Sequence, residues 1–238
     1  NAETAGNEDA RRPTFDIKDI KPVDVQLSIT VPFQQLIVQD MLVSEDPLLI
    51  MGKGLGTEVI VASLLYILST PTNFANNVKK QSLVLLLNCT AEDNLKFQEE
   101  MMEISWLSED QQARDFYIVS SETSSIERRR KLYLQGGIIS VTSRILIVDI
   151  LSGIIDLKTV TGLMILHVES LTNYCNISFI TEMYREVNKW GFIKGISDSA
   201  TSFVTKGFQP LHSKLKQLKL KNPILWPRFH VKISQSLN

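Results

Sequence analysis

Short apolar runs alternate with segments of helical periodicity along most of this chain. The run at 82–88 (SLVLLLN) is continuously apolar, which is typical of a strand in a parallel sheet that helices cover on both faces. Strands are expected at 48–51, 82–88, 116–119, 138–142, 163–166 and 192–197, and helices at 57–69, 91–104, 124–133, 144–152 and 177–188. This alternation predicts an α/β fold with a doubly wound parallel sheet flanked by helices, where ligands bind at the edge at which the strands end.

Composition divides the chain into three parts. Residues 1–22 are polar and charged with little periodicity, which is typical of a tail or linker. Residues 23–200 contain the alternating pattern and form the predicted sheet domain. Residues 201–238 carry seven of the 25 Lys and Arg residues and none of the 26 Asp and Glu residues, with an amphipathic helix expected at 210–220 and an extended segment at 225–231. They are interpreted as a short basic helical extension leading into a next domain, and their charge favours an anionic partner.

The cysteines and histidines show no metal-ligand spacing. Cys89 and Cys175 lie far apart, and the histidines are scattered at positions 167, 212 and 230. The sequence therefore predicts two reduced, buried thiols in an intracellular protein and no metal site. No apolar run reaches the roughly 18 residues of a membrane-spanning helix, so no membrane partner is expected. The chain begins with Asn and shows no signal-peptide pattern, which indicates a piece of a longer protein.

Residues 51–58 (MGKGLGTE) follow an expected strand and begin an expected helix, which is the position of a phosphate-binding loop. A working loop of the G-x-x-x-x-G-K-[ST] type needs Lys after its last glycine to reach the phosphates, and then Ser or Thr to hold Mg²⁺. Here Thr57 stands in place of the Lys and Glu58 in place of the Ser or Thr. One charge attraction of about 4 kcal/mol is lost, and a repulsion of similar size is added beside the triphosphate position.

This loop is therefore interpreted as a degenerate phosphate loop that neither binds nor hydrolyses ATP. Its residues are Gly52, Lys53, Gly54, Gly56, Thr57 and Glu58. Lys53 could reach an anion from within the loop, but Glu58 would still lack the hydroxyl that holds Mg²⁺. No cofactor and no catalytic residue are assigned to this chain.

The glycines of the loop also fail to match the dinucleotide-binding pattern. Gly52, Gly54 and Gly56 form G-x-G-x-G rather than G-x-G-x-x-G, and Thr57 occupies the place of the third glycine. A structural turn between strand and helix is the favoured interpretation. A small-molecule enzyme on a Rossmann-like sheet has neither a fingerprint nor a catalytic cluster to support it.

A run of four basic residues follows an expected helix start, where Ser124 and Glu127 match the S-x-x-E capping box. Thr90 is likewise expected to cap the helix at 91–104. The candidates for phosphate contact are Arg128, Arg129, Arg130 and Lys131 in this run, and Lys214, Lys216, Lys219 and Lys221 in the basic extension. Such side chains neutralise phosphates without reading base order, which suits recognition of DNA shape. The alternative for both clusters is a solvated helix surface.

Six segments of the chain have the character of one family. They are 32–35 (PFQQ), the loop at 51–57, 125–133 (SIERRRKLY), 136–149 (GGIISVTSRILIVD), 191–194 (GFIK) and 225–231 (LWPRFHV). Together they resemble the N-terminal helicase-like region of the XPF family of structure-specific DNA repair endonucleases, in the form of a yeast-like member. The resemblance covers roughly 23–231 and implies a RecA-like domain of the superfamily 2 helicase kind.

The resemblance also locates a second helicase motif, which is disabled. Active members of superfamily 2 carry Asp-Glu-x-His at the end of a strand, where the Asp and Glu handle Mg²⁺ and the attacking water. The matching positions here are Leu166, His167, Val168 and Glu169. Leu166 cannot serve the metal-linked role of Asp, and His167 and Glu169 are expected to have no third partner, so no catalytic role is assigned to them. The later Ser-Ala-Thr-type motif is blurred at 197–200 (SDSA).

Further activities are implied for the parent protein rather than for this piece. By resemblance the parent acts in the nucleus, cutting DNA at lesions or 3′ flap junctions in nucleotide excision repair and recombination, with Mg²⁺ or Mn²⁺ at its nuclease centre. The family's E-R-K-x-x-x-D nuclease motif does not occur in this chain. The resemblance also implies a small heterodimeric partner subunit, bound through a missing C-terminal region, together with scaffold and damage-recognition proteins.

Two functions stay open from the sequence. The leading one is an ATP-independent DNA-binding and docking domain for junction, single-stranded or double-stranded DNA. The alternative is a protein-docking platform for scaffold and repair factors with little DNA affinity of its own. Trp106 and Trp226 are its candidates for exposed anchors, although large aromatic side chains are more often buried. Whether the chain takes part in an enzyme is left open, because the parent resembles a nuclease and this piece lacks the nuclease motif.

Overall fold

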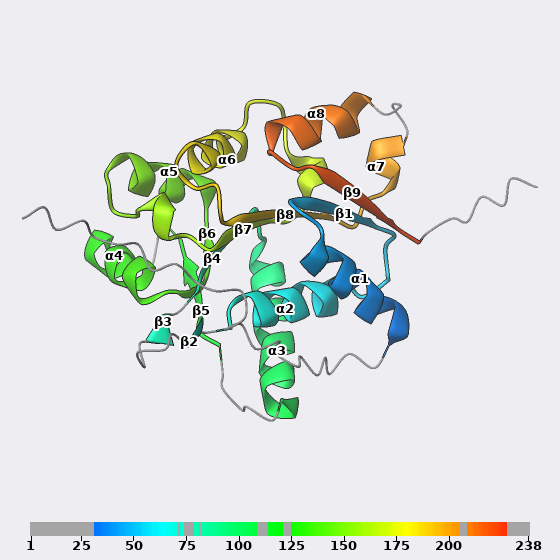
Figure 1. Cartoon of the computed structure of the whole chain (residues 1–238), viewed down its shortest axis with the longest axis horizontal. Helices are drawn as coiled ribbons and strands as arrows, with labels where there is room; N and C mark the ends of the chain where they lie inside the picture. The colour runs from blue at the N-terminus through cyan, green and yellow to red at the C-terminus, as the bar shows by residue number, and fades with distance from the viewer. Residues whose placement is uncertain are drawn as a thin grey trace, which may run out of the picture.

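The centre of the computed structural model, which describes residues 31–70, 72–73, 79–80, 82–108, 114–120, 125–204 and 209–227, is a seven-stranded sheet (Figure 1). Its strands are β1 (Pro47–Met51), β4 (Leu83–Leu87), β5 (Phe116–Val119), β6 (Gly137–Val141), β7 (Gly162–Ile165), β8 (Phe192–Ser197) and β9 (Asn222–Trp226). Their order is β5-β6-β4-β7-β8-β1-β9, and every neighbouring pair is parallel. The short strands β2 (Thr72–Asn73) and β3 (Lys79–Lys80) form a separate antiparallel pair.

Helices cover both faces of the sheet, which confirms the predicted α/β architecture (Figure 1). One face carries α1 (Pro32–Val43), α2 (Thr57–Leu68) and α3 (Ala91–Leu107). The other face carries α4 (Ile126–Gln135), α5 (Ser143–Leu151), α6 (Asn176–Val187), α7 (Thr201–Val204) and α8 (Gln209–Gln217). The short 3-10 helices η2 (Leu157–Thr159) and η3 (Val168–Ser170) flank β7.

Successive residues of the central strands pack into two different cores. Leu48 and Ile50 of β1 lie in the core under α4 to α8, whereas Leu49 and Met51 lie in the core under α1 to α3. This follows from the period-two alternation of side chains along a strand. Every residue of β1 and of β4 is buried, so the continuously apolar run at 82–88 is confirmed as a strand covered on both faces.

Two expected helix caps have different outcomes. Thr90 forms a complete capping box with Asp93, because the Asp93 N–H donates to Thr90 Oγ1 and the Thr90 N–H donates to Asp93 Oδ2. The cap of α4 is Ser125, whose hydroxyl oxygen accepts from the Arg128 N–H over 3.3 Å. The prediction of Ser124 as this cap was wrong by one residue, and Ser124 itself lies outside the described residues.

The sheet includes a strand from the segment that was predicted to leave the domain. β9 pairs in parallel with β1 from Pro47 opposite Asn222 to Met51 opposite Trp226. The predicted boundary between 23–200 and 201–238 is therefore corrected, because the sheet continues to residue 226. Residues 222–226 follow a Lys-rich helix and show no alternating apolar pattern that would predict a sheet strand. They form a strand because they pair with β1. The predicted tail at 1–22 lies outside the described residues.

Single residues named from the sequence also have clear positions. Cys89 and Cys175 are free thiols, as expected, but they are half-buried rather than fully buried. Trp106 is 81% exposed at the end of α3, while Trp226 packs against the core under α1 to α3. Among the described residues, no helix is both long and apolar enough to span a bilayer.

Candidate functional site

The predicted phosphate loop lies between β1 and α2, at the edge of the sheet where the parallel strands end. Two of its glycines have left-handed backbone conformations, with φ of +80° at Gly54 and +77° at Gly56. A Cβ added at Gly56 would lie 2.4 Å from Nε2 of Gln34, so both conformation and space favour glycine there. The strand, turn and helix that the sequence predicts around this loop are all present.

Neighbouring elements hold the loop through two hydrogen bonds. Gln34 of α1 is only 8% exposed and donates from Nε2 to the carbonyl oxygen of Leu55 over 3.1 Å. The Gly52 N–H donates to the carbonyl oxygen of Trp226 over 3.0 Å, which extends the β1–β9 pairing into the loop. In a working phosphate loop the backbone N–H groups point at the anion. Here at least one of these donors is used inside the sheet.

The two substituted positions after the loop also make internal contacts. The Thr57 hydroxyl lies 3.9 Å from Sδ of Met51, at hydrogen-bond range for sulfur. The Glu58 carboxylate lies 3.8 Å from Nζ of Lys96, which also pairs with Glu92 over 2.8 Å. Glu92, and then Glu58, raise the pKa of Lys96. The expected carboxylate beside the triphosphate position therefore belongs to a surface network with α3, while Lys53 is exposed at the loop.

In the degenerate helicase box at the end of β7, His167 pairs with Asp93, a contact that the sequence did not predict. Nε2 of His167 lies 2.7 Å from Oδ2 of Asp93, and its Nδ1 lies 3.8 Å from Oε1 of Glu169. Asp93, and then Glu169, raise the pKa of His167 to about 10. The expectation that His167 and Glu169 have no third partner was wrong, because Asp93 comes from α3, which is 74 positions away in sequence from His167.

A protonated imidazole between carboxylates is a poor general acid or base at neutral pH, because its pKa lies well above 7.

Two features hold the turn that contains His167. His167 has a left-handed backbone (φ 49°), and Asn88 donates from Nδ2 to the Leu166 carbonyl oxygen over 2.8 Å. His167, Glu169 and Asp198 place one ligand atom each within 4.8 Å of one another, so they could hold a divalent cation. Such an ion would have to displace the imidazole proton.

The predicted basic run on α4 separates into one structural residue and three exposed ones. Arg129 donates from Nε to Oδ2 and from Nη2 to Oδ1 of Asp149, each over 2.8 Å, and the Asp149 side chain is fully buried. The Tyr133 hydroxyl donates to the same carboxylate over 2.7 Å. Arg129 therefore ties α4 to α5, and its guanidinium is engaged inside the domain, unlike the other three residues of the run.

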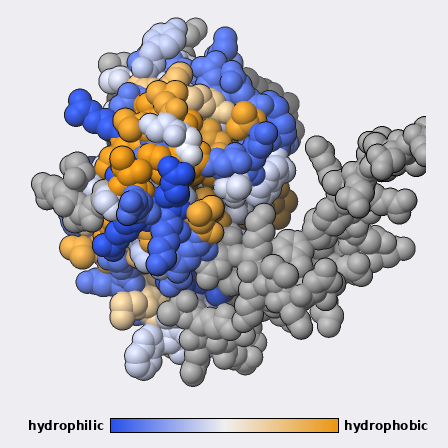
Figure 2. All heavy atoms as spheres, turned by 90° about the vertical axis from the view of Figure 1, so that its left-hand side faces the viewer, coloured by the Kyte–Doolittle hydropathy of each residue, from blue (hydrophilic) through white to orange (hydrophobic). Residues whose placement is uncertain are grey.

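Arg128, Arg130 and Lys131 remain exposed on α4, and they make no ion pair with any residue that the structure describes. The helix begins at the edge where the strands end, because it follows β5 in a parallel arrangement. Figure 2 faces this side of the molecule and shows hydrophilic and apolar side chains intermixed on it. The apolar ones on α4 and α5 include Ile126 and Leu134.

The four lysines predicted as a second cluster do not form one surface. Lys214 is half-buried on α8, and burial lowers its pKa. Lys216, Lys219 and Lys221 line a pocket at the opposite edge of the sheet, where strands begin. Lys221 is paired with Glu45 there. Helical periodicity alone cannot reveal this division, because it depends on how α8 crosses the sheet.

Sequence comparison with known proteins shows which family this chain belongs to. It is 49% identical over 93% of its length to DNA repair protein RAD1 of Saccharomyces cerevisiae. It is 33% identical over 90% of its length to DNA repair protein rad16 of Schizosaccharomyces pombe, and 33% identical over 82% to DNA repair endonuclease XPF of Mus musculus. The chain belongs to the XPF family. It covers 20–22% of the length of these three relatives, and no family model matches it.

The XPF-family chain also has a solved structural counterpart. Its fold matches the helicase domain of Hef from Pyrococcus furiosus with a TM-score of 0.63 over 81% of this chain and 37% of that one. Sequence identity is 18%, so the likeness concerns the fold, and it confirms the predicted RecA-like architecture. In this XPF-family chain, Leu166 is buried and Thr57 and Glu58 make contacts within the domain.

Proposed function

We propose that this region is an ATP-independent DNA-binding and docking domain of a structure-specific endonuclease. Relatives that match most of the chain are named DNA repair proteins or DNA repair endonucleases. The observation that carries the proposal is the exposed cluster of Arg128, Arg130 and Lys131 on α4, at the ligand-binding edge of the sheet. Exposed cations that make no ion pair within the described part of the chain are available to DNA phosphates.

The loss of ATP dependence is supported by the contacts around the degenerate loop. The Gly52 N–H is engaged by β9, and Leu166 replaces the Asp that serves the metal in active superfamily 2 members. The domain thus offers a rigid helicase-like surface without a turnover step. For the whole protein, we propose cutting at lesions or 3′ flap junctions in nucleotide excision repair and recombination, in the nucleus, with Mg²⁺ or Mn²⁺ at a nuclease centre in another region. Its small partner subunit would bind through a C-terminal region of the whole protein.

The test is binding of the chain to a labelled splayed-arm DNA at 50 and 200 mM salt. If three phosphates are contacted, affinity falls about 40-fold over this range. The variant Arg128→Glu/Arg130→Glu/Lys131→Glu should abolish this binding while keeping Arg129 and therefore the fold. Arg130→Glu is compared singly with Lys158→Glu, an equal charge change on η2, which precedes β7 at the edge of the sheet where the strands begin. Equal affinity of wild type and the triple variant for the splayed-arm DNA would contradict the proposal.

A protein-docking platform is the second candidate, and one observation favours it. Met102, Trp106 and Leu107 are 61%, 81% and 71% exposed at the C-terminal end of α3. Exposed aromatic and apolar side chains in one place are typical anchors of protein interfaces. This candidate predicts association with a scaffold protein that tolerates salt and is weakened by Trp106→Ala, with little DNA affinity.

A further inference from the structure

A pocket of about 570 Å³ opens at the edge of the sheet opposite the degenerate loop. It lies where β1, β8 and β9 begin, since Asp46, Gly191 and Lys221 directly precede these strands and all line it. Its size falls within the range of about 300–1,000 Å³ that is typical of ligand pockets. No contact described for the loop or for α4 involves it.

The pocket carries a surplus of positive charge. Its basic residues are Arg185, Lys189, Lys194, Lys216, Lys219 and Lys221, and its acidic residues are Glu45 and Asp46. Both acids are already paired, Asp46 with Arg185 over 2.6 Å and Glu45 with Lys221. Lys189, Lys216 and Lys219 make no ion pair to any described residue, so they are available to an anion.

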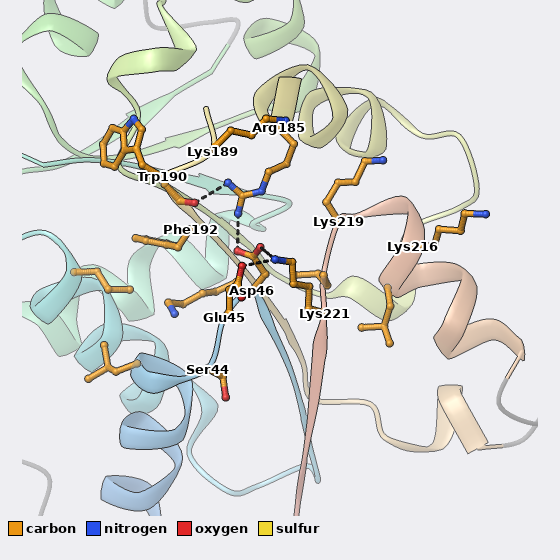
Figure 3. Close-up of a pocket in the computed structure, with 16 residues that line it drawn as sticks. Ser44, Glu45, Asp46, Arg185, Lys189, Trp190, Phe192, Lys216, Lys219 and Lys221 are labelled. Carbon is orange, nitrogen blue, oxygen red and sulfur yellow. Dashed lines mark hydrogen bonds and ion pairs between the residues drawn. The ribbon is translucent and has the colours of Figure 1, made fainter. Parts of the chain in front are cut away.

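The centre of the pocket is fixed by a buried network (Figure 3). Asp46 is 4% exposed with a left-handed backbone (φ 45°), and its Oδ1 accepts from the Ile193 N–H over 2.9 Å and from Arg185 over 2.6 Å. Arg185 also donates to the carbonyl oxygens of Gly191, over 2.7 Å, and of Asn188, over 3.2 Å. The segment that leads to Trp190 is therefore held from both sides, which limits the ordering cost of binding.

Lys194 forms part of the floor of the pocket. It is 3% exposed, and its Nζ donates to the Met41 carbonyl oxygen over 2.6 Å. Burial lowers the pKa of Lys194 to about 8, against the opposing effect of Asp46. A bound anion would favour the protonated ammonium, so anion binding at pH 8 to 9 should take up a proton.

Trp190 supplies a flat apolar surface at the mouth of the pocket. Its side chain is 62% exposed although large aromatic side chains are mostly buried. Figure 3 shows it on one side of the Arg185–Asp46 pair, with Lys219 and Lys216 on the other side. An exposed indole together with lysines is the combination that holds single-stranded nucleic acid, because the ring stacks on a base and the lysines neutralise phosphates.

We propose that this pocket binds one nucleotide of single-stranded DNA, with its base on the Trp190 indole and its phosphates near Lys189 and Lys219. The inference rests on the proposed DNA-binding function, and it adds a second contact at the far edge of the domain. Single strands are favoured over duplex DNA because a base within a duplex presents no free face to the indole.

The test measures binding of the whole chain to a labelled 16-nucleotide oligothymidine and to a hairpin duplex of equal charge. Trp190→Ala should weaken oligothymidine binding about 5- to 150-fold, the loss expected for one stacked base, and leave duplex binding unchanged. Trp190→Phe should keep most of the affinity because an aromatic face remains. Lys189→Glu/Lys219→Glu should weaken oligothymidine binding and reduce its salt dependence.

The outcomes distinguish this inference from the proposed function. If Trp190→Ala binds oligothymidine like wild type while the triple α4 variant loses DNA, the pocket proposal is overturned and the proposed function stands. If the triple α4 variant binds oligothymidine like wild type and Trp190→Ala does not, the pocket proposal is supported and the proposed α4 site is contradicted. Competition by thymidine monophosphate but not by inorganic phosphate supports recognition of a base. Displacement by a polyglutamate peptide and not by the nucleotide overturns it in favour of an acidic peptide.

Discussion

Arg129 donates two hydrogen bonds of 2.8 Å to the fully buried carboxylate of Asp149, and this pair joins α4 to α5. Its neighbours in sequence, Arg128 and Arg130, are exposed. Of four consecutive basic residues, one therefore packs inside the domain and three face solvent, because a helix turns each successive side chain by about 100°. The division decides which substitutions test DNA binding and which test the fold.

Replacing Arg129 should destabilise the domain strongly. Among the described residues, Arg129→Ala leaves the buried Asp149 carboxylate with the Tyr133 hydroxyl as its remaining side-chain partner, so the free energy of unfolding should fall by about 3–5 kcal/mol. Urea unfolding followed by circular dichroism measures the change. Arg128→Ala is the matched control and should alter stability by less than about 0.5 kcal/mol. Equal effects of the two substitutions would contradict the structural role of Arg129.

The His167–Asp93 pair should make stability depend on pH in a defined direction. The folded pKa of about 10 lies above the ordinary 6.5, so the contribution of His167 is fully present below pH 6.5 and is lost as pH rises through about 10. His167→Asn tolerates the left-handed backbone and removes the charge. The stability difference between wild type and this variant should shrink from pH 6.5 to pH 10. A constant difference would rule out a charged imidazole.

The titration of Lys194 should change stability with pH in the opposite direction to that of His167. Its folded pKa of about 8 lies below the ordinary 10.5, so the folded state releases its proton first and stability rises with pH between about 8 and 10.5. Lys194→Met removes this titration and retains most of the buried volume. Wild type should gain stability relative to the variant between pH 7 and pH 10, as measured by urea unfolding at several pH values. A gain by the variant over this range would refute the assignment.

Magnesium and ATP should leave the domain unchanged. A ligand at a hundred times its dissociation constant adds about 2.7 kcal/mol of stability, which shifts the thermal midpoint by several degrees. With Thr57 and Glu58 engaged inside the domain, 1 mM MgATP should produce no saturable shift. Thr57→Lys alone should not restore one, because Leu166 still occupies the place of the metal-binding Asp. A saturable shift in wild type would contradict the proposed ATP independence.

The sequence by itself determined the alternation of strands and helices between residues 48 and 197, the place of the degenerate loop and the cap at Thr90. These features depend on local periodicity and on residues within one or two turns of each other, which are readable along the chain. It also contained the family signature in segments such as TSRILIVD and LWPRFHV.

Only the tertiary structure decided which of these residues meet. The pairing of β9 with β1, the contact of Asp93 with His167 and the gathering of Trp190 with Lys219 join positions far apart in sequence. A lone lysine or histidine has the same local signature whether it is paired, buried or free. Its role is set by the charge and the solvent that the packed fold places around it, and no local pattern encodes these.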